Sequence, residues 1–192
     1  VTEAINVAML ALLDPGDEII IIEPAHENFV PSALLSGARP VPVPLTDNTF
    51  KLDVDMLKES LSEHTRVLML NTPHNPSGRV FDANEMLAIT DFVVNNNLIL
   101  ITDEIYDRVL YDGRTHVCPG SIEVLRDRTV TLGGMSKTFA ITGWRLGYII
   151  ASSNLMKAMR PVHDYLTVCA PTPLQMAAVT ALNLPQEYYD DM

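Results

Sequence analysis

The chain has 192 residues, 47% of them hydrophobic, and its 13 basic and 24 acidic side chains give a formal net charge of −11 at pH 7. An acidic chain without a basic cluster is a poor partner for nucleic acid or an anionic membrane surface, and its apolar runs are too short to cross a bilayer. The two cysteines, Cys118 and Cys169, have no metal-ligand or disulfide-framework spacing, which favours packed thiols in a reducing cytoplasm and predicts no metal site.

The first segment of the chain is in helical period, with Ile5, Met9 and Leu12 on one face. Short apolar runs then alternate with helical patterns. The predicted strands are residues 17–24, 39–45, 65–71, 98–104, 128–134 and 145–152, and several are apolar on both faces, as in a covered parallel sheet. The predicted helices are residues 26–37, 53–64, 82–97 and 153–166, and residues 185–192 resemble the start of another.

Helix starts have their own signals, and Asp53, Asp82 and Ser153 are the expected N-caps. The alternation of strands and helices predicts a doubly wound α/β fold, a three-layer sandwich with a mostly parallel sheet. No repeat or low-complexity linker divides the chain, which favours one domain or a piece of one. Ligands of such sheets bind where strands end at their carboxyl edge, so the polar residues just after each strand are the candidates for a site.

Four such places stand out, and each has an ordinary reading. Asn75 lies in "LNTPHNPSGRVF", which could be only a turn. Asp103 and Glu104 follow an apolar strand, either as a solvated acidic loop or as partly buried carboxylates that need partners. Lys137 could be a surface lysine, although the preceding Gly133 and Gly134 would let the backbone approach a ligand closely. Arg145 could form an ordinary ion pair.

One chemistry uses all four places together. Pyridoxal phosphate needs an amine for its Schiff base, an anion beside its pyridine nitrogen, donors for its phenolate oxygen and a phosphate site. The sequence offers Lys137, Asp103, Asn75 with Tyr106, and Arg145 for these tasks in that order.

The chain resembles the large domain of the class I and II aminotransferases, which are fold-type I pyridoxal-phosphate enzymes. The resemblance is carried by "VTEAI", "NPSG", "DEIYDRVLYDG" and "SKTFAITGWRLGY" and covers essentially the whole chain. It implies the cofactor-binding fold of that family and transfer of an amino group from an amino acid to a 2-oxo acid through a Schiff base on Lys137.

The resemblance also implies roles for individual residues. Lys137 would hold the cofactor and move a proton between the substrate α-carbon and the cofactor. Asp103 would pair with the protonated ring nitrogen, and Asn75 and Tyr106 would hydrogen-bond the phenolate oxygen. Arg145 would bind the phosphate through its planar fork of donors.

Further residues follow from the same motifs. Thr2 would grip the phosphate together with the first helical amides. Where the family often has a serine three residues before the lysine, this chain has Gly134, and Ser136 would supply the hydroxyl instead. His26 stands where many relatives place an aromatic ring over the pyridine, so we expect it to stack there, with a loop histidine as the alternative. We expect His74 to be structural.

The resemblance implies that residues 1–192 are a large domain incomplete at both ends, without the small carboxy-terminal domain. The arginine for the substrate carboxylate would then follow Met192. The family further implies a homodimer and leaves the amino acid and the 2-oxo acid open.

Two other functions share these motifs. One is a different pyridoxal-phosphate reaction, such as that of a carbon–sulfur β-lyase or a cyclopropane-forming synthase. The other is the cofactor-sensing domain of a transcription regulator, which a winged-helix segment upstream would reveal.

Overall fold

The computed structural model describes residues 1–46 and 49–192. Six strands in this part of the chain form one sheet. The strand order is β2-β1-β3-β4-β5-β6, five strands run parallel and β6 is antiparallel to β5, so the predicted mostly parallel sheet is confirmed. The strands are β1 (Glu18–Glu23), β2 (Arg39–Pro44), β3 (Thr65–Asn71), β4 (Ile99–Asp103), β5 (Thr129–Gly134) and β6 (Gly147–Ala151).

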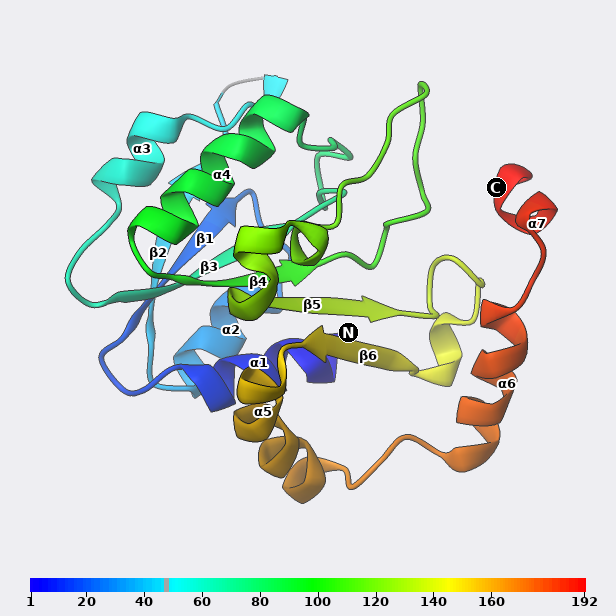
Figure 1. The fold of residues 1–192 in the computed structure, drawn as a ribbon. Helices are drawn as coiled ribbons and strands as arrows, with labels where there is room; N and C mark the ends of the chain where they lie inside the picture. Colours follow the sequence, from blue (N-terminus) through cyan, green and yellow to red (C-terminus); the bar gives the residue numbers. More distant parts are fainter. Residues whose placement is uncertain (47–48) are drawn as a thin grey trace.

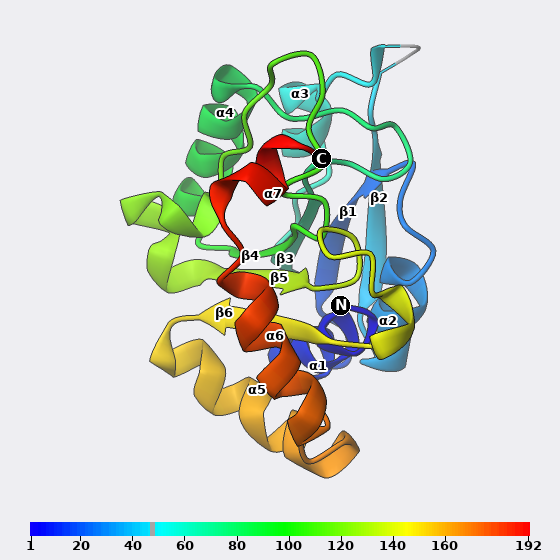
Figure 2. The same ribbon diagram turned by 90° about the vertical axis from the view of Figure 1, so that its right-hand side faces the viewer.

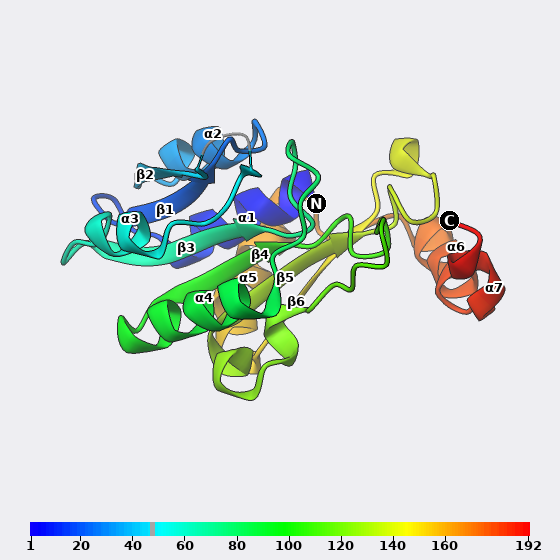
Figure 3. The same cartoon turned by 90° about the horizontal axis from the view of Figure 1, so that it is seen from above.

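Helices cover both faces of the sheet, which gives the three predicted layers (Figure 1). One face carries α1 (Thr2–Leu12), α2 (Phe29–Leu35) and α5 (Ser153–Leu166), and the other carries α3 (Val54–Glu59) and α4 (Ala83–Asn95). Two more helices, α6 (Thr172–Leu182) and α7 (Gln186–Asp190), lie beyond the carboxyl end of β5 (Figures 1 and 3). Short 3₁₀ turns are η2 (Pro119–Ser121), η3 (Glu123–Arg128) and η4 (Thr142–Trp144).

The strands are apolar on both faces because each face packs against helices. In β1, Ile19 and Ile21 join the cluster under α1 and α2, whereas Ile20 and Ile22 join the cluster under α3 and α4. Side chains alternate between the faces along a strand. Consecutive residues at a strand end therefore project into different surroundings.

Two of the three predicted N-caps are confirmed. The Asp53 carboxylate accepts from the amides of the first turn of α3, and Asp82 forms a reciprocal capping box with Glu85 at the start of α4. The prediction for Ser153 is wrong by one residue, because Ser152 is the N-cap of α5. The Ser152 hydroxyl donates to the Asp127 carbonyl at 3.4 Å instead of capping the helix.

Helix lengths differ from the predictions. The segment 53–64 is helical only as far as Glu59, and the Ser60 hydroxyl turns back to the Leu57 carbonyl at 2.7 Å, a local bond that competes with helix continuation. Helix α6 was not predicted, because Pro171 and Pro173 resemble a loop, although proline is well accommodated in the first turn of a helix.

Five strands end at the same edge of the sheet, and β6 begins there because it runs the opposite way. The loops after β1, β3, β4 and β5 and the segment before β6 therefore meet along this carboxyl edge. The amino end of α1 lies there too, beside β6 (Figure 2). None of the described helices is both long enough and apolar enough to span a bilayer.

Candidate active site

A cavity of about 240 Å³ lies at this carboxyl edge. All eight residues predicted from the sequence line it: Thr2, His26, Asn75, Asp103, Tyr106, Ser136, Lys137 and Arg145. They come from α1, from the end of β4 and from loops that are far apart in the sequence. The fold thus brings the predicted site together, while the role of each residue remains a proposal.

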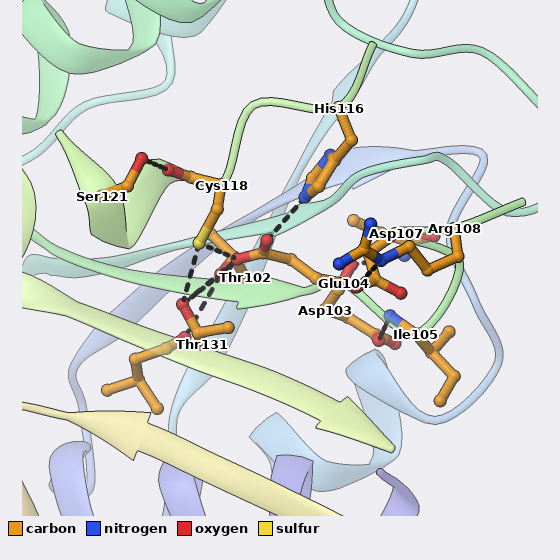
Figure 4. Close-up of polar contacts among 12 residues, drawn as sticks. Thr102, Asp103, Glu104, Ile105, Asp107, Arg108, His116, Cys118, Ser121 and Thr131 are labelled. Carbon is orange, nitrogen blue, oxygen red and sulfur yellow. Dashed lines mark hydrogen bonds and ion pairs between the residues drawn. The ribbon is translucent and has the colours of Figure 1, made fainter. Parts of the chain in front are cut away.

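Asp103 is the last residue of β4 and only 3% exposed. Its Oδ1 accepts a hydrogen bond from the Ile105 amide at 3.1 Å (Figure 4). Burial raises the pKa of the Asp103 carboxyl to about 6, and the Ile105 hydrogen bond opposes that rise. A buried carboxylate at the wall of a cavity is poised for a cation that enters it.

Asn71, the last residue of β3, links two loops of the site. Its Nδ2 donates to the Asp103 carbonyl at 2.9 Å, and its Oδ1 accepts from the Asn75 amide at 2.6 Å. Asn71 is 3% exposed and lines the cavity. We did not predict it, although it satisfies the rule that selected Asp103, namely a polar side chain at the end of an apolar strand.

Lys137 is exposed on this chain, and its Nζ lies 5.5 Å from the centroid of the Tyr106 ring. An ammonium group over an aromatic face is attracted by the ring quadrupole. The neighbouring Ser136 is buried, and its carbonyl accepts from the Thr142 hydroxyl at 2.9 Å. Thr142 adds a hydroxyl to the cavity wall that no local sequence signal indicates.

Arg145 ends the η4 turn with a left-handed backbone, φ 57°. Its Nη1 donates to the Thr142 carbonyl at 2.9 Å, and the rest of its guanidinium group remains available at the cavity. The positive φ is uncommon for a residue other than glycine, and here it lies where the chain turns from η4 into β6.

The amino end of α1 closes another side of the cavity. Its N-cap is Val1, an aliphatic residue without a capping side chain, so the first helical amides are free to bind an anion. The Thr2 hydroxyl accepts from Asn28 Nδ2 at 3.4 Å, and that nitrogen lies 3.3 Å from His26 Nε2. His26 packs edge-on against Phe29, with 5.6 Å between ring centroids.

The two glycines of β5 serve packing rather than ligand approach, which corrects our expectation. A Cβ at Gly133 would lie 2.4 Å from the Tyr148 ring, and one at Gly134 would lie 3.0 Å from the Leu146 carbonyl oxygen. The lack of a side chain at both glycines therefore leaves room for Tyr148 and for the backbone at the start of β6. Neither belongs to the residues that line the cavity.

His74 does not line the cavity either. It is 3% exposed, and its Nδ1 lies 2.7 Å from the Ser77 hydroxyl. Burial lowers the pKa of His74 to about 4, so the ring is neutral at neutral pH. This setting agrees with the structural role expected from the sequence.

The groups around the cavity fit pyridoxal phosphate. The buried Asp103 carboxylate suits a ring cation, Lys137 supplies a primary amine, and the Arg145 guanidinium suits a phosphate beside the amino end of α1. An amine, a buried carboxylate and phosphate-binding donors at the carboxyl edge of a covered α/β sheet are the groups that a pyridoxal-phosphate enzyme needs.

Comparison with known proteins agrees. The sequence profile of the family Aminotransferase class I and II matches residues 1–192. The chain is 39% identical over 181 residues to the aspartate aminotransferase of Pyrococcus abyssi, covering 94% of this chain and 46% of that protein. It is 36% identical over 184 residues to the probable N-succinyldiaminopimelate aminotransferase DapC of Mycobacterium tuberculosis, covering 95% of this chain and 46% of that protein.

Solved structures are similar over nearly the whole chain. N-succinyldiaminopimelate aminotransferase from Mycobacterium tuberculosis matches with a TM-score of 0.95 and 35% identity, covering 98% of this chain and 50% of that one. YbdL from Escherichia coli, with an identified methionine aminotransferase function, matches with a TM-score of 0.94 and 34% identity, covering 98% of this chain and 50% of that one.

The chain belongs to the class I and II aminotransferase family, whose cofactor is pyridoxal phosphate. It spans about half the length of the relatives that it matches.

Proposed function

We propose that these residues form the large, cofactor-binding domain of a longer enzyme, an aminotransferase that moves an amino group from an amino acid to a 2-oxo acid. The observation that carries the proposal is the buried Asp103 carboxylate in the same cavity as the Lys137 amine and the Arg145 guanidinium group. The membership of the chain in the class I and II aminotransferase family supports the same activity.

Four residues would hold the cofactor around its ring and phosphate. Arg145 would pair with the phosphate through its free guanidinium donors, and Thr2 and Ser136 would add hydroxyl groups. The α1 amides next to Thr2 favour negative charge at the same place. His26, which lines the cavity, would cover one face of the ring.

Asp103, Asn75 and Tyr106 would set the electronic state of the ring. When bound, pyridoxal phosphate supplies a ring that accepts the electron pair left on the substrate carbon after a proton is removed. The Asp103 carboxylate would keep the ring nitrogen protonated. The positive charge of that nitrogen would in turn stabilise the ionised form of Asp103. Asn75 and Tyr106 would donate hydrogen bonds to the phenolate oxygen.

Lys137 would hold the cofactor covalently and serve as the acid–base group. Its amine would serve as the base that removes the proton from the substrate α-carbon and as the acid that returns it. No other lysine lines the cavity in the described part of the chain, so this role rests on Lys137 alone.

Borohydride reduction of the full-length protein with its cofactor tests the assignment. We expect the visible absorption to be lost and peptide mapping to place the reduced cofactor on Lys137. A label on Lys58 or Lys157 would refute the site. With an amino acid panel, accumulation of pyridoxamine phosphate and a 2-oxo acid identifies a transaminase, whereas release of ammonia and a thiol identifies a β-lyase.

We also propose that the full-length protein acts as a homodimer in the cytoplasm. A groove of about 1180 Å³ between α1, α2, α5 and β6 adjoins the site, and Leu35, Trp144, Leu166 and Val168 line it with exposed apolar side chains. A second copy of the chain would cover these residues around a two-fold axis. The two free cysteines suit a reducing compartment.

Light scattering of the active full-length protein tests the assembly. We expect a mass of two chains at all concentrations that support turnover. An active species with the mass of one chain would contradict the dimer.

A further inference from the structure

A second buried carboxylate, Glu104, lies next to Asp103 but on the opposite face of the sheet. Glu104 is 5% exposed. Its Oε1 accepts from the Thr102 hydroxyl at 2.7 Å and from the Thr131 hydroxyl at 3.1 Å, and its Oε2 lies 2.6 Å from His116 Nε2 (Figure 4). No residue of the cavity wall is among these partners.

The chemistry of the side chains determines which group donates each hydrogen bond. Each threonine hydroxyl donates to Oε1, and an ionised carboxylate can only accept, so His116 donates through Nε2. The Cys118 thiol adds a weak donor at 3.5 Å. A buried carboxylate is tolerated when its lone pairs are satisfied in this way, and removing the partners would leave a costly unpaired charge.

These contacts hold a long irregular segment at both ends. Residues 106–117 contain no helix or strand, and His116 and Cys118 bring their far end back to the residue from which the segment starts. The backbone turns at once after Glu104. Its carbonyl accepts from the Asp107 amide at 3.0 Å, and the Tyr106 carbonyl accepts from the Val109 amide at 2.8 Å.

The same turn orients two residues of the cavity. The Ile105 amide, one residue beyond Glu104, donates to Asp103 Oδ1, and Tyr106 follows directly with its ring under the Lys137 ammonium group. The Glu104 amide is itself fixed to the Leu132 carbonyl of β5 at 2.8 Å. A shift of Glu104 would therefore move the Ile105 amide, which orients Asp103. It would also move the backbone of Tyr106 and with it the tyrosine ring.

We propose that Glu104, paired with His116, is a positioning residue that sets the orientation of Asp103 and Tyr106 from the far side of the sheet. The inference rests on the proposed function in that Asp103 and Tyr106 hold the cofactor. Glu104 does not touch the cavity, so its effect passes through the Ile105 turn.

The structure distinguishes two substitutions of Glu104. In Glu104→Gln the amide oxygen still accepts from both threonines, and its nitrogen can donate to His116 Nε2 if the imidazole proton moves to Nδ1. His116 Nδ1 has no hydrogen-bond partner in the described part of the chain, so it can take up the proton without breaking an existing contact. Glu104→Ala removes every contact. Positioning by hydrogen bonds predicts that glutamine rescues and alanine does not.

Glu18 provides a matched control. It is 1% exposed, forms an ion pair with Arg39 and accepts from the Ser62 hydroxyl at 2.6 Å and the Thr65 hydroxyl at 3.1 Å. It lies at the amino end of β1, the edge of the sheet farthest from the cavity. Glu18→Ala therefore breaks a comparable buried network without touching the Ile105 turn.

The experiment compares these variants in the full-length protein. Cofactor affinity is measured from the visible absorption, and hydrogen exchange is followed over residues 105–109. We expect Glu104→Ala to weaken cofactor binding and to lower kcat by about 10- to 100-fold each, the range found when hydrogen-bond partners behind metal ligands are removed. Exchange over residues 105–109 should accelerate. Glu104→Gln should stay close to wild type, and Glu18→Ala should lose thermal stability with unchanged affinity and exchange.

The proposal is overturned if Glu104→Ala lowers the melting temperature like Glu18→Ala but retains wild-type cofactor affinity and exchange. If Glu104→Ala does not fold, His116→Ala decides by the same criteria, because it frees the segment and leaves both threonine donors in place. Affinity and exchange are measured without substrate. A reaction other than transamination therefore leaves the comparison intact, whereas a label away from Lys137 refutes the proposed function itself.

Discussion

Burial of Asp103 disfavours its ionised form, and the neighbouring residues do not fully compensate for this effect. The carboxyl group is buried, it accepts a hydrogen bond from the Ile105 amide, and its pKa is raised to about 6. In the unfolded chain an aspartate titrates near pH 3.9. Between these values the folded protein binds the extra proton, so the stability of the cofactor-free protein falls as the pH rises through this window.

Asp103→Asn should therefore stabilise the cofactor-free full-length protein above pH 6, by up to about 3 kcal/mol for a shift of about two pKa units. The advantage should shrink as the pH falls from 6 toward 4, because wild-type Asp103 is then protonated in the folded state and increasingly protonated in the unfolded state. The asparagine oxygen can still accept from the Ile105 amide. Urea unfolding from pH 5 to 8 measures the effect, and a pH-independent difference between the two proteins would contradict it.

At the scale of the element, the start of α4 allows a test of how much an N-cap contributes to stability. The Asp82 carboxylate accepts from the amides of Asn84 and Glu85 at 2.9 Å, and the Asp82 amide donates to the Glu85 carboxylate at 3.0 Å. We expect Asp82→Ala to lower the free energy of unfolding by about 1 kcal/mol, as usual for loss of an N-cap, and to leave kcat unchanged. Asp82→Asn should retain most of the stability. An Asp82→Ala protein with a wild-type urea midpoint would show that the cap contributes nothing.

Some elements and site residues could be predicted from sequence because their signal is local. Strands such as β1 are continuous apolar runs, and Asp103 and Lys137 stand at fixed positions in motifs next to such strands. Thr142 and the contact between Glu104 and His116 depend on how a loop returns, and no local pattern encodes that path. Helix α6 was missed because proline at a helix start has the same sequence signature as a loop.

At the scale of the whole molecule, the 192-residue chain alone should be a poor catalyst. It supplies the cavity residues but spans about half the length of its relatives, and the family resemblance predicts that the arginine for the substrate carboxylate is in the other half. Positioning of that kind contributes several kcal/mol to barrier lowering. Exposed apolar residues such as Leu35 and Val168 also favour aggregation of the isolated piece. Assays of both proteins with saturating cofactor should show much slower turnover by the shorter one, and equal rates would contradict this expectation.

Asp103, at the end of β4, and Glu104, directly after it, point to opposite faces of the sheet, and this placement limits how the length of β4 can change in evolution. Inserting or deleting one codon within β4 would exchange the two faces, because side chains alternate along a strand. Glu104 would then point toward the cavity, and Asp103 would point toward Thr131 and His116 on the other face. Both carboxylates would still be encoded, yet each would stand in the other's surroundings. In functional descendants of this gene, β4 should therefore vary by substitution, and length changes should accumulate in the loop that follows it.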